Sequence, residues 1–453
     1  EAKIVPAAEQ GVNTETVPDE RRQQAALSTG MLQSLVGKGE RIEAHFGSPQ
    51  DIEWSLAGDS LWVLQSRPIT NLPPAPLTDV TWEPPRAGGK LIRRQVVEHM
   101  PDPLSPLFDE LYLRVGLDRS TDTFLHEFDF DFDLDRLIER PLFVTANGYA
   151  YARADYHVDL TIVPGILGAY VKMLPSLLRT AIPRWQDRKL PAYLRVIDQW
   201  RVLGTTTADD GQLWCGVQSL AVADAIYWFE VSIMLGLAKV TDNLLNWYVS
   251  RLGREPALTS GLFLCGFPSK TLEAQADLEA IAHQLRASAA LQALVLETPP
   301  SRLLEVLRVT PEAEAAVEGI QRYLEKYGHQ IYTLDFSEPT QGEDALPILV
   351  GLRALVETPT NMAQRQAEIA QEREALTASV AQSLAPLPSR LFLLLLSWAQ
   401  KYGPYREEAL FYIGAAWPTL RSFANELGGR LVDDGSLQDP DDIYYLNMDE
   451  IES

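Results

Sequence analysis

The chain has 453 residues, 46% of them hydrophobic, a net charge of −23 and an isoelectric point near 4.7. This length suits two or more domains, and the acidic balance argues against nucleic acid and anionic membranes as main partners, because both bind basic surfaces. Cys215 and Cys265 are the only cysteines, too few for a disulfide framework or a cysteine metal site. With no apolar run near the roughly 18 residues of a membrane span and no signal peptide, we expect a cytoplasmic protein.

The first predicted element is a helix over residues 18–46. It opens with Pro18, Asp19 and Glu20, because proline and acidic side chains are favoured in a first helical turn. The broken apolar stripe along it contains Leu27, Met31, Leu32, Leu35, Ile42 and Phe46. The Gly-Ser-Pro segment at 47–49 predicts its end.

A β-hairpin is predicted next, over residues 51–67. Pairing Glu53 with Gln65, and Asp51 with Arg67, places the polar side chains on one face. A slip of one residue would mix polar and apolar side chains, so the pattern itself selects this register. The predicted apolar face contains Ile52, Trp54, Leu56, Trp62 and Leu64.

The residues alone leave two interpretations of the polar face open. One is a half-solvated hairpin with a cross-strand ion pair between Asp51 and Arg67. The other is a ligand clamp, because opposed side chains have Cβ atoms roughly 4.5–5.5 Å apart, so Glu53 and Gln65 can share one ligand. A carboxylate and an amide oxygen suit Mg²⁺, and a guanidinium suits a phosphate.

A proline-rich stretch at 70–89 follows the hairpin, and it forbids a helix or a central strand there. We therefore predict one domain over 1–72, a linker over 73–89 and a second domain over 90–453. Helices are predicted in the second domain at 164–182, 191–204, 218–252, 271–295, 311–327, 344–357, 360–383, 388–402 and 405–427, with strand or irregular structure at 144–156. The expected fold is mainly α, with a small α+β part of one helix and one hairpin at the N-terminus.

The hairpin carries a specific resemblance. The segment Gln50-Asp51-Ile52-Glu53-Trp54, together with Gln65-x-Arg67-Pro68, in which Gln65 stands twelve positions after Glu53, resembles the closing segment of the ATP-grasp nucleotide-binding domain in the phosphoenolpyruvate synthase and pyruvate phosphate dikinase superfamily. The resemblance implies ATP and Mg²⁺ as cofactors. It implies that Glu53 and Gln65 bind ATP and the metal, and that Arg67 binds ATP and is catalytic, contacting the phosphates that are cleaved.

The second domain resembles the substrate domain of rifampin phosphotransferases and their relatives. Four segments carry this likeness, at 98–108, 323–330, 405–413 and 439–451. The family mechanism implies that ATP is cleaved in the ATP-grasp domain, and that a histidine on a swivelling domain carries the β-phosphate to an organic hydroxyl acceptor. No histidine of this chain lies in such a carrier motif, so we expect a fragment of a longer phosphotransferase, inactive alone, with the swivelling domain as its partner.

The acceptor site is expected to include Glu98, His99, His329 and Arg406. Capping, a structural histidine and a local ion pair are the plainer alternatives for these residues. On a continuous helix over 405–427, Arg406 would share a face with Leu410, Ile413, Trp417, Leu420, Ala424 and Leu427, which predicts that it points toward the interior or a pocket mouth. Leu410 and Gln330 stand where the family commonly has basic residues, which weakens the case for rifamycin as the acceptor more than the case for phosphotransfer.

Three functions therefore compete. The first is an ATP-dependent phosphotransferase acting on a small organic hydroxyl compound, with rifamycin and hence antibiotic resistance as one candidate. The second is a ligase or condensing enzyme of the same superfamily that joins two metabolites after phosphoryl activation. The third is a non-catalytic helical binding protein, against which the intact set of Glu53, Gln65 and Arg67 argues, because a degenerate remnant has no reason to keep all three. None of them involves nucleic acid or a membrane.

Overall fold

The computed structural model describes residues 2–6, 12–16, 27–46, 49–57, 60–68, 89–93, 95–127, 140–154, 176–252 and 258–453. The chain forms two compact units, Glu1–Thr81 and Trp82–Ser453. Residues 69–88 lie outside the described ranges, so the predicted linker and the domain limits drawn from it stay predictions.

The first unit contains two antiparallel strand pairs and a helix. Strand β1 (Ala2–Pro6) pairs with β2 (Val12–Thr16), and β3 (Gln50–Ala57) pairs with β4 (Ser60–Pro68). Helix α1 (Thr29–Phe46) packs against β3 and β4. It ends where the sequence predicts, whereas the predicted first turns at 18–26 lie outside the described residues.

The second unit is predominantly helical, which confirms the predicted mainly α fold. Near its start, the second unit contains a three-stranded sheet with the strand order β5-β7-β6. The elements up to the longest helix are β5 (Leu91–Ile92), η2 (Gln95–His99), α2 (Pro106–Phe108), η3 (Asp109–Gly116), α3 (Leu117–Glu127), β6 (Phe143–Ala146), β7 (Tyr149–Arg153), η5 (Trp185–Lys189), α5 (Leu190–Arg201) and α6 (Asp210–Val249). Those that follow are η6 (Ser250–Leu252), α7 (Gly261–Leu264), α8 (Lys270–Arg286), α9 (Ala289–Glu297), α10 (Pro300–Arg308), η7 (Pro311–Ala313), α11 (Glu314–Tyr327), α12 (Leu346–Glu357), α13 (Met362–Ser383), α14 (Pro386–Phe411), α15 (Trp417–Asp433), η8 (Pro440–Tyr445) and α16 (Met448–Glu452).

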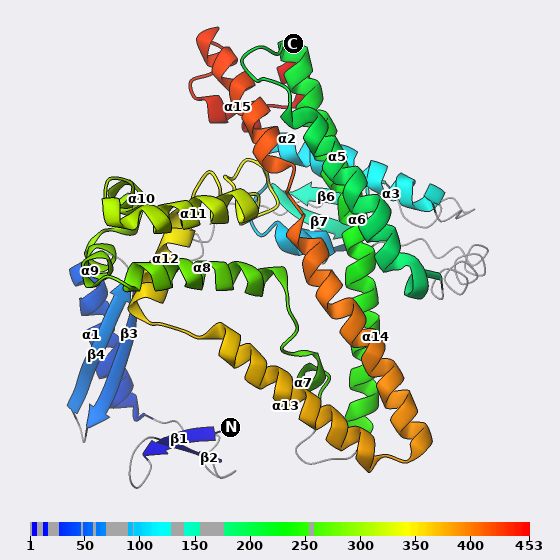
Figure 1. Ribbon diagram of the computed structural model, residues 1–453. Helices are drawn as coiled ribbons and strands as arrows, with labels where there is room; N and C mark the ends of the chain where they lie inside the picture. The colour runs from blue at the N-terminus through cyan, green and yellow to red at the C-terminus, as the bar shows by residue number, and fades with distance from the viewer. Residues whose placement is uncertain are drawn as a thin grey trace. The chain divides into compact units, whose positions relative to one another are not determined.

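Helix α6 is the central scaffold of the second unit. It begins with a capping box, in which the Asp209 carboxylate accepts a hydrogen bond from the backbone N–H of Gln212. Helix α14 runs antiparallel beside it (Figure 1). Two hydrogen bonds show the pairing: Tyr248 near the end of α6 donates to the Pro388 carbonyl at the start of α14, and Tyr227 donates to the Ala409 carbonyl near the end of α14.

Helix α6, together with the turn that follows it, is also the one candidate membrane span among the described residues. Residues Asp210–Leu252 are long and apolar enough to cross a membrane, but 56% of their most apolar window is buried inside the protein. A central core helix passes the same test of length and composition, so this finding is weak evidence for a membrane span.

The buried apolar side chains form three clusters. The largest joins η2, η3, α5, the first part of α6 and α15. The second holds helices α8–α12 together, and the third lies where the end of α6 meets α7, α13 and the start of α14. The first two clusters contain residues of the four segments that resemble the substrate domain.

Two of the predicted helices have different bounds in the structure. The predicted helix over 271–295 is two helices, α8 and α9, and the predicted helix over 405–427 is wrong. Helix α14 instead continues through Pro404 to Phe411, and α15 begins at Trp417. The break occurs at Gly414, whose φ of +72° ends a right-handed helix.

Candidate functional site

The hairpin of the first unit has the predicted register over its first half. Glu53 lies opposite Gln65, and Asp51 lies opposite Arg67. Beyond Glu53 the predicted register is wrong, because an irregularity between Glu53 and Trp54 shifts the pairing by one residue. The shift places Trp62 opposite Ser55, on the face that carries Glu53, rather than on the predicted apolar face.

Arg67 joins the polar side chains of this face. Its Nη2 donates to Glu53 Oε1 at 2.8 Å and to Gln65 Oε1 at 3.1 Å. The side chains of Arg67 and Glu53 are 57% and 53% exposed, so the cluster is open to solvent. The guanidinium thus contacts Glu53 and Gln65, and not the directly opposed Asp51 of the plainer interpretation. The oxygens of Glu53 and Gln65 can act as ligands of a divalent cation, and the nearby guanidinium of Arg67 can bind a phosphate.

Helix α1 packs against both strands of the hairpin. The Lys38 ammonium donates to the Leu61 carbonyl at 2.6 Å, and Gly39 lies beside Ile52. Trp62 and Leu64 stay 61% and 65% exposed. The first unit therefore presents large apolar side chains beside an open polar cluster.

In the second unit, loop 328–343 brings together the segments that carry the predicted acceptor residues. Its two ends are joined by hydrogen bonds from Gln341 N to Gln330 O and from Gly342 N to Gly328 O. Between them, Leu334 N donates to the His99 carbonyl, at 3.0 Å. Residues that are 235 positions apart in sequence are thus in direct contact.

His99 lies on η2 at this loop, with Glu98 exposed beside it. The His99 ring makes an edge-to-face contact with the Trp228 ring, at 5.3 Å between centroids. Partial desolvation by its neighbours lowers the pKa of His99, and the Glu98 charge opposes this effect. His99 is therefore neutral at pH 7, with part of its ring open to solvent.

His329 begins the loop and packs against the end of α14. Its Nε2 lies 3.0 Å from the Phe411 carbonyl oxygen. Since a carbonyl only accepts hydrogen bonds, Nε2 carries the proton and Nδ1 is an acceptor. Burial lowers the pKa of His329, which keeps the ring neutral.

Arg406 does not point into the interior, the first of the two places predicted for it, and instead lines a cavity of about 410 Å³. Its side chain is 46% exposed and pairs with the adjacent carboxylate of Glu407. The physical reason is the helix break at Gly414, which removes the continuous apolar face on which that prediction depended.

Two adjoining cavities lie around residues 266–269, with volumes of about 760 Å³ and about 410 Å³. The larger is also lined by Lys270, Gln366 and Tyr405, and the smaller by Arg406. The buried Oε1 of Gln366 has no hydrogen-bond partner among the described residues. Apart from Arg406, these lining side chains gave no signal in the sequence, because they come from α8, α13 and α14, which are far apart along the chain.

The predicted acceptor residues Arg406 and His329 line two different cavities. The cavity lined by His329 has a volume of about 370 Å³, and Glu98 and His99 line none of these three. Loop 328–343 contacts His99 through a backbone hydrogen bond and the end of α14 through the His329 ring, whereas Arg406 pairs with the adjacent Glu407 within α14.

A buried carboxylate, Asp224, holds the turn between α14 and α15. Its Oδ1 accepts from the Tyr112 hydroxyl at 3.0 Å, and its Oδ2 accepts from the Tyr193 hydroxyl and from Gly414 N at 2.8 Å. Burial raises its pKa to about 6, against the opposing effect of the three hydrogen bonds. A lone aspartate inside an apolar helical segment was the available sequence signal, and sequence reasoning missed it.

Comparisons with known proteins agree with both units. Residues 1–83 match the AMP/ATP-binding domain of pyruvate phosphate dikinase, and residues 230–407 match the fourth domain of rifampicin phosphotransferase. A rifampicin phosphotransferase from a Streptomyces species is 51% identical over 74 residues, which are 16% of this chain and 9% of that protein. A probable phosphoenolpyruvate synthase from Methanothermobacter thermautotrophicus is 48% identical over 56 residues, 12% of this chain and 8% of that protein.

A longer match covers nearly the whole chain. The uncharacterized phosphotransferase YvkC from Bacillus subtilis is 21% identical over 98% of this chain, which spans 53% of the length of that protein. The nucleotide-binding match precedes the match to the fourth domain of rifampicin phosphotransferase along the chain, which is the domain order predicted from the sequence. The two units are thus similar to proteins of the phosphoenolpyruvate synthase and pyruvate phosphate dikinase superfamily, and in particular to rifampicin phosphotransferases.

Proposed function

We propose that this chain is the end of the nucleotide-binding domain and the acceptor domain of a longer ATP-dependent phosphotransferase. The ATP β-phosphate passes through a phosphohistidine on a domain outside this chain to a small organic hydroxyl acceptor in the cytoplasm. The observation that carries the proposal is the contact of Arg67 with both Glu53 and Gln65, within the part of the chain that matches an AMP/ATP-binding domain.

In this proposal each residue of the cluster has its own role. Glu53 and Gln65 supply hard oxygen ligands for Mg²⁺, whose charge would neutralise the ATP phosphates. Arg67 turns from these two side chains to the phosphate that is being cleaved. Phosphoryl transfer needs mainly positioning and charge stabilisation, so such a set requires no protein nucleophile at the ATP itself.

The acceptor is proposed to bind near the adjoining cavities around residues 266–269. Their volumes, about 760 Å³ and about 410 Å³, fall in the range of small-molecule sites. The orphaned Gln366 Oε1 offers a hydrogen bond to an acceptor hydroxyl, and Arg406 supplies positive charge at the rim. A rifamycin is one acceptor of suitable size.

The test uses the protein encoded by the complete reading frame, incubated with Mg²⁺ and ATP labelled at the β-phosphate. We expect acid-labile label on the wild-type protein, and its loss in Arg67→Ala. Arg41→Ala is the matched control, because Arg41 is an exposed arginine of α1 in the same unit. Absence of label on a wild-type protein that still binds ATP would refute the phosphohistidine relay and favour direct-transfer ligation or simple binding.

A further inference from the structure

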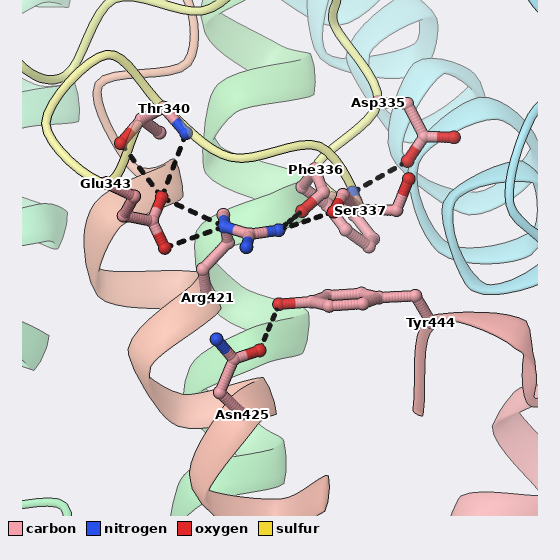
Figure 2. Close-up of polar contacts among 8 residues, drawn as sticks. All are labelled: Asp335, Phe336, Ser337, Thr340, Glu343, Arg421, Asn425 and Tyr444. Atoms are coloured by element: carbon pink, nitrogen blue, oxygen red, sulfur yellow. Dashed lines mark hydrogen bonds and ion pairs between the residues drawn. The ribbon is translucent and has the colours of Figure 1, made fainter. Parts of the chain in front are cut away.

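Two buried side chains of α15 bind loop 328–343: Trp417 donates from Nε1 to the Leu334 carbonyl at 3.0 Å, and Arg421 contacts two further stretches of the loop. Arg421 is 5% exposed, and Figure 2 shows its guanidinium between two stretches of the loop. Its Nη1 donates to the carbonyl oxygens of Phe336 and Ser337, both at 2.7 Å. Its Nε lies 2.9 Å from both carboxylate oxygens of Glu343. One guanidinium thus holds the middle and the end of the loop.

The partners of Arg421 are themselves held in place. Glu343 Oε2 accepts hydrogen bonds from the backbone N–H and the hydroxyl of Thr340, both at 2.9 Å. The Tyr444 ring lies 5.2 Å from the guanidinium, and its hydroxyl donates to Asn425 at 2.6 Å (Figure 2). Burying a charge without partners is costly. Here the Glu343 carboxylate, two carbonyl oxygens and the Tyr444 ring compensate the buried guanidinium.

The anchored residues lie next to the residues that orient the two histidines. Phe336 is two positions from Leu334, whose backbone N–H donates to the His99 carbonyl. Glu343 follows Gly342, whose N–H donates to the carbonyl of Gly328, the residue before His329. A displacement at either anchor therefore reaches one of the histidines through a single backbone hydrogen bond.

We propose that Arg421 is a positioning residue for His99 and His329, two of the predicted acceptor residues, and that it clamps loop 328–343 onto α15 so that the two histidine segments keep fixed positions relative to each other. This inference rests on the proposed function for its catalytic meaning. A planar guanidinium is needed because its fixed donors reach a carboxylate and two carbonyls together, which the single ammonium of a lysine cannot reproduce.

The test compares Arg421→Lys with Arg430→Lys in this chain. Arg430 is the matched control, because it lies on the same helix and also bridges carboxylates and carbonyls, namely Glu426, Asp210, Ala208 and Thr205. The pH titrations of the imidazole protons are followed by NMR. We expect the titration midpoints of His99 and His329 to rise by about half a pH unit in Arg421→Lys, because loosening the loop relieves their desolvation, and to stay unchanged in Arg430→Lys.

Unchanged midpoints in a folded Arg421→Lys protein would overturn the inference, as would equal shifts in the Arg430→Lys control. If Arg421→Lys does not fold, Glu343→Gln takes its place, because it keeps the shape of the anchor and removes its charge, and the same two outcomes decide.

A second measurement separates this inference from the proposed function. In the complete protein, Arg421→Lys should form acid-labile label at the wild-type rate, with a raised KM for rifampicin as the probe acceptor. A wild-type protein without label refutes the proposed function, whatever the titrations show. Label that is not passed to rifampicin excludes that acceptor, and the titrations then decide the positioning role alone.

Discussion

Replacing Gly414 by alanine tests how tightly the turn between α14 and α15 is packed beside the His329 segment. With φ of +72°, the backbone there is left-handed, which costs an alanine about 1–2 kcal/mol. An added Cβ would lie 2.7 Å from Ile331 Cγ2 and 3.0 Å from its Cδ1, and relieving such overlap in a packed site costs about 1–3 kcal/mol. We therefore expect Gly414→Ala to lower the free energy of unfolding by about 2–5 kcal/mol.

The second unit offers a control that separates these two costs. Gly435 has φ of +78° and no atom within 4 Å of its added Cβ, so Gly435→Ala should lose about 1–2 kcal/mol from the backbone alone. Urea unfolding followed by tryptophan fluorescence measures both variants. Adding Ile331→Ala should cost less in the Gly414→Ala background than in the wild type, because it removes the overlapping atoms. Equal losses in the two glycine variants, with additive effects of Ile331→Ala, would refute the packing argument.

Two further predictions concern buried charges. Burial raises the pKa of Asp224 to about 6, so its protonated carboxyl contributes stability that is fully present below its ordinary pKa and is lost as the pH rises through 6. The free energy of unfolding of the wild type, relative to that of Asp224→Asn, should therefore fall by about 2 kcal/mol between about pH 4.5 and about pH 7. A difference between the two proteins that stays constant with pH in urea titrations would contradict the shift. Arg184 donates to the buried Glu230 at 2.6 Å, so Arg184→Met should cost about 3 kcal/mol by leaving that carboxylate buried beside Lys189 alone. Arg184→Met combined with Glu230→Leu should recover most of this loss in the same assay, and no recovery would show that the pair itself is not the cause.

The hairpin shows how far a local pattern can predict a site. Alternation of polar and apolar residues was sufficient to pair Glu53 with Gln65, because a slip of one residue exchanges the two faces of a strand. The same rule failed beyond Glu53, since it assumes an unbroken ladder and the irregularity after Glu53 shifts the pairing. The contact of Arg67 with Glu53, rather than with the directly opposed Asp51, follows from the reach and direction of the side chain.

The helices show a similar limit. Apolar periodicity located α11 and α12 closely, because each buries a stripe against neighbouring helices. It joined α14 to α15, since the apolar residues continue at helical spacing across Gly414 while the backbone does not. Arg406 was consequently expected to point to the interior or a pocket mouth, and the structure leaves it exposed beside Glu407 and lining a cavity.

The amino-acid sequence by itself determined the likeness to the superfamily, the mainly α fold and the hairpin that carries Glu53, Gln65 and Arg67, because these depend on local spacing and composition. The tertiary structure alone decided that Arg421 grips loop 328–343 and that this loop joins His99 to His329. Contacts between residues far apart in the chain depend on how several helices pack at once, and no local pattern of polarity encodes which buried charge meets which backbone carbonyl.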